Sequence, residues 1–256
     1  MRAWLSLTEA PRAGLDLASL FTAAPFLSLS PRGDGHPVMV LPGFLADDDS
    51  TWLLRQYLSR LGYNALPWGQ ERNLGAAAMG GYEPLVQEVL RIHRQQQQKV
   101  TLIGWSLGGV HALAVAHRAE YAVRGVMTLG SPLHPPKADG SDMTSIGRAL
   151  QNAASSMNAK PVPVPQNWRN MALKLSDQLP VSSIFSHTDG VVPWQRSILS
   201  PGPRRENIRV VSSHIGLGFN PTVYYALADR LAQPQDSFKP FDTGGLRSLV
   251  YPPQRT

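Results

Sequence analysis

Residues 99–120, KVTLIGWSLGGVHALAVAHRAE, combine a strand pattern, a serine between glycines and a helical pattern, in that order. Val100–Ile103 is a short apolar, mostly β-branched run of the kind found in interior parallel strands. The last part of the segment carries apolar residues at helical spacing. Between these parts, Ser106 has Gly104 and Gly108 two positions away on either side. A Cβ at either glycine would collide with neighbouring backbone, so the pattern predicts a sharp turn that exposes the serine.

Ser106 is therefore a candidate nucleophile. The N–H groups at the start of the following helix carry partial positive charge and would lie beside its hydroxyl. The pattern G-x-S-x-G is short and arises by chance, but a strand before it and a helix after it make it specific. A histidine and a carboxylate later in the chain, each just after a strand, would complete the site.

Both residues are present. Residues 181–186 form a strand pattern that leads to Asp189, and residues 207–211 form another that leads to His214. In a parallel sheet, the carboxyl ends of the strands meet at one edge. We therefore expect Asp189 and His214 to lie near Ser106.

The order serine, aspartate, histidine resembles that of the α/β-hydrolases of the lipase and esterase branch. The resemblance covers roughly residues 36–232 and depends on three separated motifs. It implies a catalytic triad in which Ser106 is the nucleophile, His214 the general base and Asp189 the acid that orients the imidazole.

The segment Met39–Asp47 resembles the strand and glycine turn that supply an oxyanion donor in this family. Pro42 and Gly43 stand where lipases commonly have a His-Gly pair. The resemblance implies that the backbone N–H groups of Phe44 and Leu107 form the oxyanion hole.

The reaction implied is hydrolysis of a small-molecule or lipid carboxylic ester through an acyl-enzyme, with no metal or organic cofactor. An acyltransferase, a thioesterase or an amidase would use the same triad. A non-catalytic binding protein on the same fold is a further alternative.

The alternation of strand and helix patterns predicts an α/β fold, with a mostly parallel central sheet of about six strands flanked by helices. We expect one α/β-hydrolase domain over residues 1–256, and no strand before residue 37. Strands are predicted near 37–41, 64–67, 100–103, 123–129, 181–186 and 207–211, and helices near 50–61, 83–97, 107–116 and 221–232. The tail from Gln233 is expected to lie across the surface.

Residues 133–180 form the most irregular interval, and in this fold such an interval often carries a cap or lid. One helical pattern contains Ile146 and Leu150, and a second contains Trp168 and Leu175, joined by KPVPVP. The two patterns predict small helices that cover the serine, or that pack on the flank of the domain.

The other histidines are expected to have structural or surface roles, although His134 could line the mouth of the pocket. The acidic run Asp47–Asp49 precedes a predicted helix, so capping is favoured over a metal site. Trp68–Gly75 resembles a W-G-x-x-x-N-x-G loop at the edge of lipase sites. Asn73 in that loop would orient a turn or have a purely structural role.

Composition sets further limits. The chain has no cysteine and a net charge of +6, with basic residues scattered along it, so no nucleic-acid partner is expected. No apolar run reaches the length of a membrane span. Asp16 and Pro25 interrupt the start of the chain, which lacks the pattern of a signal peptide, and we expect a cytoplasmic location.

Overall fold

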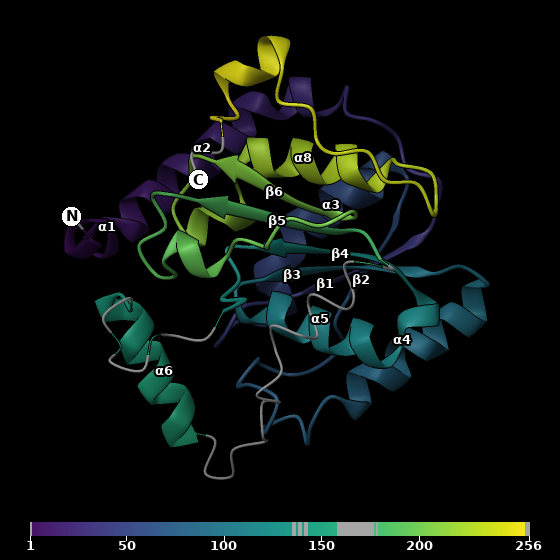
Figure 1. The fold of residues 1–256 in the computed structure, drawn as a ribbon, viewed down its shortest axis with the longest axis horizontal. Helices are drawn as coiled ribbons and strands as arrows, with labels where there is room; N and C mark the ends of the chain where they lie inside the picture. Colours follow the sequence, from purple (N-terminus) through teal and green to yellow (C-terminus); the bar gives the residue numbers. More distant parts are fainter. Residues whose placement is uncertain are drawn as a thin grey trace.

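Within the described residues, a parallel sheet of six strands runs through the middle of the molecule (Figure 1). The structure is a computed structural model and describes residues 2–134, 137, 140, 143–157, 177 and 179–253. The strand order is β2-β1-β3-β4-β5-β6, and every neighbouring pair is parallel. The strands are β1 (Pro37–Leu41), β2 (Asn64–Pro67), β3 (Val100–Trp105), β4 (Val123–Leu129), β5 (Val181–Ser186) and β6 (Arg205–Val210). The predicted α/β fold is confirmed.

The central strands are apolar on both faces because helices cover both sides of the sheet. Side chains alternate along a strand, so Val38 and Val40 of β1 belong to one core while Met39 and Leu41 belong to the other. In Figure 1, α2, α3 and α8 lie on one side of the sheet and α4 and α5 on the other. The helices are α1 (Arg2–Leu7), α2 (Glu9–Leu27), α3 (Trp52–Leu61), α4 (Glu83–Gln96), α5 (Leu107–Arg118), α6 (Ser145–Met157) and α8 (Pro221–Leu231).

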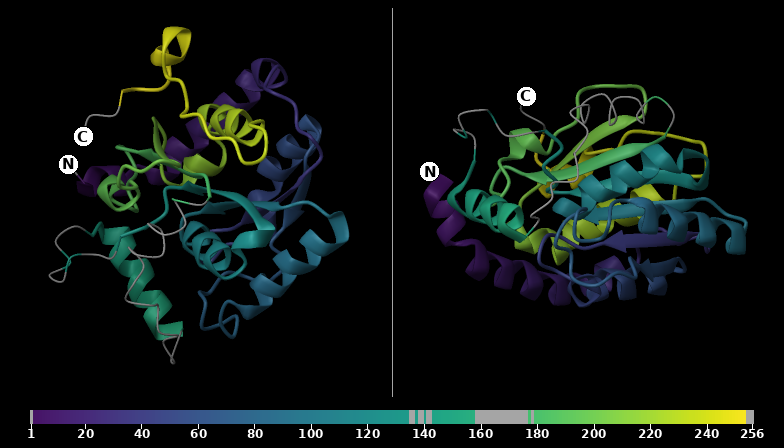
Figure 2. Two further views of the ribbon diagram at one scale, coloured as in Figure 1. Left: turned by 45° about the vertical axis from the view of Figure 1, so that its right-hand side comes forward. Right: turned by 90° about the horizontal axis from the view of Figure 1, so that it is seen from below.

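The two N-terminal helices were not predicted from the sequence. In Figure 2 they run as a long arm along one side of the molecule. α2 packs against α8 and the 3₁₀ helix η4 (Ile215–Gly218). Only a narrow part of α2 is buried, and that part includes the charged Glu9 as well as Leu20 and Leu27. A helix whose buried side is narrow and partly polar has a weak apolar period, which explains why it was missed.

The first helical pattern of the 133–180 interval is confirmed as α6, which carries Ile146 and Leu150. The second pattern, with Trp168 and Leu175, lies outside the described residues. The C-terminal tail is held by two buried aromatic rings, Phe241 and Tyr251, which pack against each other and join the core on the α8 side.

The turn between β3 and α5 depends on close backbone packing. A Cβ on Gly104 would lie 2.3 Å from the backbone of Gly109, and one on Gly108 would lie 2.3 Å from the Leu41 carbonyl oxygen. Ser106, between them, has φ 53° and ψ −119°. An L-residue held in such a region costs about 1–3 kcal/mol, so the surrounding packing has to stabilise it.

Replacement of Gly108 by alanine is expected to lower the free energy of unfolding by about 3 kcal/mol, because the methyl group overlaps rigid backbone of β1. Gly14→Ala is the matched control. Gly14 lies on the exposed side of α2 with no atom within 4 Å of the added Cβ. This control should raise the stability by about 0.5–1 kcal/mol, since alanine favours helix over coil. Urea denaturation of both variants measures the difference, and a neutral Gly108→Ala would contradict the close packing.

Candidate active site

Ser106 lies in the turn between β3 and α5, at the carboxyl edge of the sheet. Its N–H donates to the Leu129 carbonyl at the end of β4, over 2.8 Å, and its own carbonyl accepts from the Gly109 N–H. These bonds hold the strained turn, and Ser106 lines the adjacent cavity. Leu107 begins α5, so the serine precedes a helix N-terminus, as the sequence predicts.

The structure brings Ser106, Asp189 and His214 together. His214 Nε2 lies 3.0 Å from Ser106 Oγ, and His214 Nδ1 lies 2.6 Å from Asp189 Oδ2. Asp189 follows β5 and His214 follows β6, so all three residues come from strand ends at one edge. Both Asp189 and His214 are only 6% exposed, which shields their hydrogen bond from water.

Asp189 is oriented by its own loop. Its Oδ1 accepts from the N–H groups of Val191 and Val192, at 2.8 and 2.7 Å, which leaves Oδ2 for the imidazole. Gly130 makes room for this pair, since a Cβ there would lie 3.0 Å from Asp189 Oδ2 and 3.2 Å from His214 Nδ1. Gly130 has no signal in the sequence, because the space it leaves is filled by residues from two distant loops.

Two opposing effects act on the pKa of His214. Burial disfavours the charged imidazolium and is the largest single effect. The negative charge of Asp189, its hydrogen bond to the ring and the charge of Glu9 oppose it, and the result is a pKa above the ordinary 6.5. The imidazole is thus a stronger base than a free histidine. Glu9 comes from α2, a helix to which the sequence analysis assigned no role.

The predicted oxyanion donors lie beside the serine. Phe44 and Leu107 line the same cavity as Ser106. Neither of their backbone N–H groups donates a hydrogen bond to another residue in the described part of the chain. Gly43 brings its turn close to the nucleophile, because a Cβ at this position would lie 3.3 Å from the Ser106 Cβ.

Asn73 is completely buried and holds this turn in place. Its side-chain amide donates to the Pro42 carbonyl over 2.8 Å, and its backbone exchanges hydrogen bonds with Leu45 and Ala46. The buried His111 in turn contacts Asn73 Oδ1 at 3.1 Å. These contacts support the interpretation in which Asn73 of the Trp68–Gly75 loop orients the turn.

The other candidates have structural roles. Asp47 caps the 3₁₀ helix η1 (Asp48–Thr51), as predicted, and Asp48 accepts from the backbone N–H groups of Trp68 and Gly69. His134 contacts the Ile198 carbonyl and is not among the cavity-lining residues that the structure describes. In the described residues, no group of three or more histidines or acids is placed to hold a metal ion.

An open cavity of about 240 Å³ leads to Ser106. Its walls are mostly apolar, and α6 contributes Leu150 and Gly147. The predicted cap interval therefore borders the serine in its described part. The described residues that line the cavity are Phe44, Ser106, Leu107, Pro132, Met143, Gly147, Leu150, Val191, Val192 and Arg196.

Residues 82–215, just over half of the chain, match the family profile described as a PGAP1-like alpha/beta domain. The chain belongs to this family, and the predicted resemblance to the α/β-hydrolases is confirmed. The matched region contains Ser106, Asp189 and His214. A comparison with curated proteins gives no match.

Solved structures of low sequence identity share the fold. Lipase B of Aspergillus fumigatus has a TM-score of 0.57 at 14% identity, with 78% of this chain and 53% of that chain covered. A soluble variant of the Saccharomyces cerevisiae monoglyceride lipase has a TM-score of 0.56 at 14% identity, with 80% and 88% covered. A variant of an N-formylmaleamic acid deformylase from Pseudomonas putida has a TM-score of 0.52 at 13% identity, with 78% of this chain and 94% of that chain covered.

At these identities the likeness shows the fold alone. The chain spans about half the length of the Aspergillus lipase. Within the described residues, no helix is both long enough and apolar enough to span a bilayer.

The pKa values of His214 and His111, two buried histidines near the turn, should shift in opposite directions from the ordinary value. The pKa of His214 is expected above 6.5, whereas burial without a charged partner lowers the pKa of His111 to about 4. Two-dimensional NMR of the imidazole resonances over a pH series measures both in one sample. A His214 pKa below 6.5 would mean that burial outweighs the carboxylates.

Proposed function

We propose that this protein is a serine hydrolase that cleaves carboxylic esters through an acyl-enzyme intermediate. One observation carries the proposal: His214 bridges Ser106 and Asp189 within hydrogen-bond distance, at 3.0 and 2.6 Å, in a shielded position beside an apolar cavity. A serine hydroxyl is a weak nucleophile at neutral pH, so an adjacent base is the minimum requirement for its chemistry.

In the first half of the reaction, Ser106 Oγ attacks the ester carbonyl carbon while His214 Nε2 accepts the hydroxyl proton. Asp189 stabilises the imidazolium that results. The carbonyl oxygen becomes an oxyanion, which the N–H groups of Phe44 and Leu107 would stabilise by about 3 kcal/mol per donor. The bond to the leaving alcohol then breaks, and His214 returns its proton to the alcohol oxygen.

In the second half, a water molecule replaces the alcohol. His214 removes a proton from the water as its oxygen attacks the acyl carbon. Collapse of the second tetrahedral intermediate releases the carboxylic acid and returns the proton to Ser106 Oγ. This sequence needs no oxidant and no second substrate besides water.

The cavity favours a substrate with an apolar acyl part of moderate size. Its lining near Ser106 is apolar and includes Met143, Leu150 and Val192. The names of the lipase structures that share the fold agree with an ester substrate, whereas the deformylase shows that other bonds are cleaved on the same fold. Thioester or amide cleavage, acyl transfer and ligand binding without catalysis are therefore outcomes that the experiments below distinguish.

We also propose, from the sequence, that residues 1–256 form one domain in which 133–180 act as the cap, and that the protein works in the cytoplasm. Limited proteolysis addresses the first point, since a cap is expected to be cut before the sheet.

The purified protein is expected to hydrolyse short p-nitrophenyl esters and to react with a fluorophosphonate probe. Ser106→Ala should lower kcat by about 10⁴-fold or more and abolish labelling, because it removes the nucleophile. Ser59→Ala is the matched control, since Ser59 is exposed on α3, and it should retain full activity. Rates and labelling are measured on the same folded samples, judged by circular dichroism.

If the folded wild-type protein neither turns over esters, thioesters and amides nor reacts with the probe, the proposal fails and a binding role is favoured. Faster turnover of thioesters or amides than of matched esters would show that the protein cleaves thioester or amide bonds in preference to esters.

A bulky residue at Leu150 should shorten the preferred acyl chain. Leu150→Trp is expected to lower kcat/KM for octanoyl relative to acetyl esters by about 10-fold or more, in line with the value of one or two methylenes in an apolar pocket. Ala149→Trp places the same side chain on the exposed side of α6 and should leave the ratio unchanged. An equal loss of kcat/KM for octanoyl and acetyl esters would show that the acyl chain does not bind against Leu150.

A further inference from the structure

α2 lies outside the residues that match the family profile, yet two of its acidic side chains reach the loops of the candidate acid and base. Glu9 is 3% exposed, and Asp16 contacts the residue that precedes His214. A carboxylate this close to a buried site is costly unless hydrogen bonds and a countercharge compensate it.

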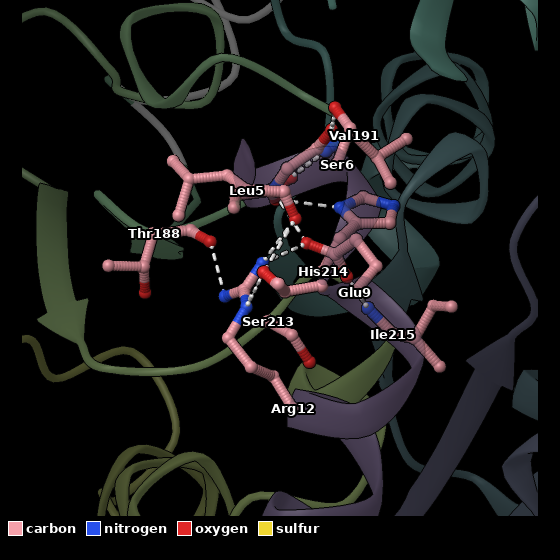
Figure 3. A network of polar contacts seen from close by, with 12 residues as sticks. Leu5, Ser6, Glu9, Arg12, Thr188, Val191, Ser213, His214 and Ile215 are labelled. Carbon is pink, nitrogen blue, oxygen red and sulfur yellow. Dashed lines mark hydrogen bonds and ion pairs between the residues drawn. The ribbon is translucent and has the colours of Figure 1, made fainter. Parts of the chain in front are cut away.

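Glu9 joins the two loops. Its Oε1 accepts from the N–H of Gly190 at 2.6 Å, and its Oε2 accepts from the N–H of Ile215 at 3.3 Å. Gly190 directly follows Asp189, and Ile215 directly follows His214. Figure 3 shows the side chain of Glu9 next to His214 and Ile215. One carboxylate thus holds the residues that come immediately after the two members of the acid–base pair.

The N-terminal helices make close contact with the acid loop. Ser6 Oγ donates to the Gly190 carbonyl over 2.6 Å. A Cβ on Gly190 would lie 2.5 Å from the Leu5 carbonyl oxygen and 2.7 Å from Glu9 Oε1. The glycine after Asp189 is therefore required by the approach of the N-terminal arm, a reason that its sequence neighbourhood does not reveal.

Arg12 fixes Glu9 from the other side. Its Nη2 lies 2.8 Å from Glu9 Oε1, and its Nη1 donates to the Thr188 carbonyl over 2.6 Å. Figure 3 shows Arg12 between Thr188 and Glu9. The guanidinium offsets part of the cost of the buried carboxylate and adds a third link to the Asp189 loop.

Asp16, about two helical turns after Glu9, anchors the loop that carries His214. Its Oδ2 accepts from the backbone N–H and the hydroxyl of Ser213, at 3.1 and 3.0 Å, and from the Ser212 hydroxyl at 3.1 Å. Its Oδ1 accepts from the Asn220 side chain at 2.7 Å. One of these bonds is to the backbone N–H of Ser213, and the others hold the side chains of Ser212 and Ser213 before His214 and of Asn220 after it.

We propose that Glu9 is a positioning residue for the Asp189–His214 pair, and that α2, through Glu9 and Asp16, is an integral part of the active site. This inference rests on the proposed function, because the pair needs positioning only if His214 acts as a base. Glu9 does two things: it keeps the two loops at a constant distance, and it adds a second negative charge near the imidazole.

The second effect has a direct consequence for the reaction. Among the described residues, the charged groups that face His214 are Asp189 from the loop after β5, Glu9 with its partner Arg12 from α2, and Asp16 at the neighbouring Ser213. Glu9 raises the pKa of His214 in addition to the two contributions of Asp189. The imidazolium that forms when Ser106 attacks is therefore stabilised by two carboxylates.

Glu9→Gln tests the inference. The substitution keeps the size of the side chain, removes its charge and turns an NH₂ group toward one of two N–H donors. We expect kcat for the p-nitrophenyl esters to fall about 10- to 100-fold, the loss typical of a displaced catalytic group, with little change in KM. Since the acid limb of kcat/KM reports the base of the free enzyme, it should move to lower pH.

Two further variants sharpen the test. Glu9→Asp keeps the charge but is one methylene too short to reach both N–H groups, so it should restore the pH profile and only part of kcat. Glu83→Gln, on the exposed first turn of α4, is the matched control and should match the wild-type protein in both. The His214 pKa is read independently by NMR in all four proteins, and thermal denaturation reports whether each is folded.

The outcomes separate this inference from the proposed function. An active wild-type protein with unchanged kcat, pH profile and His214 pKa in folded Glu9→Gln overturns the role of Glu9. A wild-type protein without turnover or probe labelling overturns the proposed function and with it the catalytic role of Glu9, whatever the NMR titration gives. If Glu9→Gln does not fold, Glu9→Asp decides, and wild-type kcat in that variant overturns the inference.

Discussion

The contact of the α5 N-terminus with β1 and β3 is the constraint on which the site depends. Gly108 lies so close to the Leu41 carbonyl that no side chain fits, and Gly104 lies equally close to the first turn of α5. Ser106 is forced between them into a conformation that costs about 1–3 kcal/mol. The same contact places Leu107 and the turn of Phe44 beside the serine, in the lining of one cavity. Nucleophile and candidate oxyanion donors are thus products of one packing arrangement.

The parallel sheet supplies the rest of the geometry. Because every strand pair is parallel, the segments that follow β3, β5 and β6 emerge at one edge. Asp189 uses one oxygen to bind its own loop and the other to bind His214, so the acid is oriented independently of the base. The strands β3, β5 and β6, whose ends carry Ser106, Asp189 and His214, lie within the residues that match the family profile.

The N-terminal arm adds a second layer of control. Burial alone would lower the pKa of His214. The negative charge of Glu9 on α2 raises it. Arg12 limits the cost of burying Glu9, and Asp16 repeats the arrangement at Ser213. In a chain of net charge +6, acidic groups are gathered around the one histidine that becomes a cation in the proposed reaction.

The sequence alone predicted the six strands, the turn at Ser106 and the order in which Asp189 and His214 follow it. These features are local: strands buried on both faces are continuous apolar runs, and a serine between a strand and a helix needs glycines at set positions. Glu9 and Gly130 had no such signal. Both act between segments that are far apart in the chain: Glu9 through the hydrogen bonds of its carboxylate, and Gly130 by lacking a side chain where Asp189 and His214 meet. Only the packing of α2 against η4, and of β4 against the two loops, decided that they belong to the site.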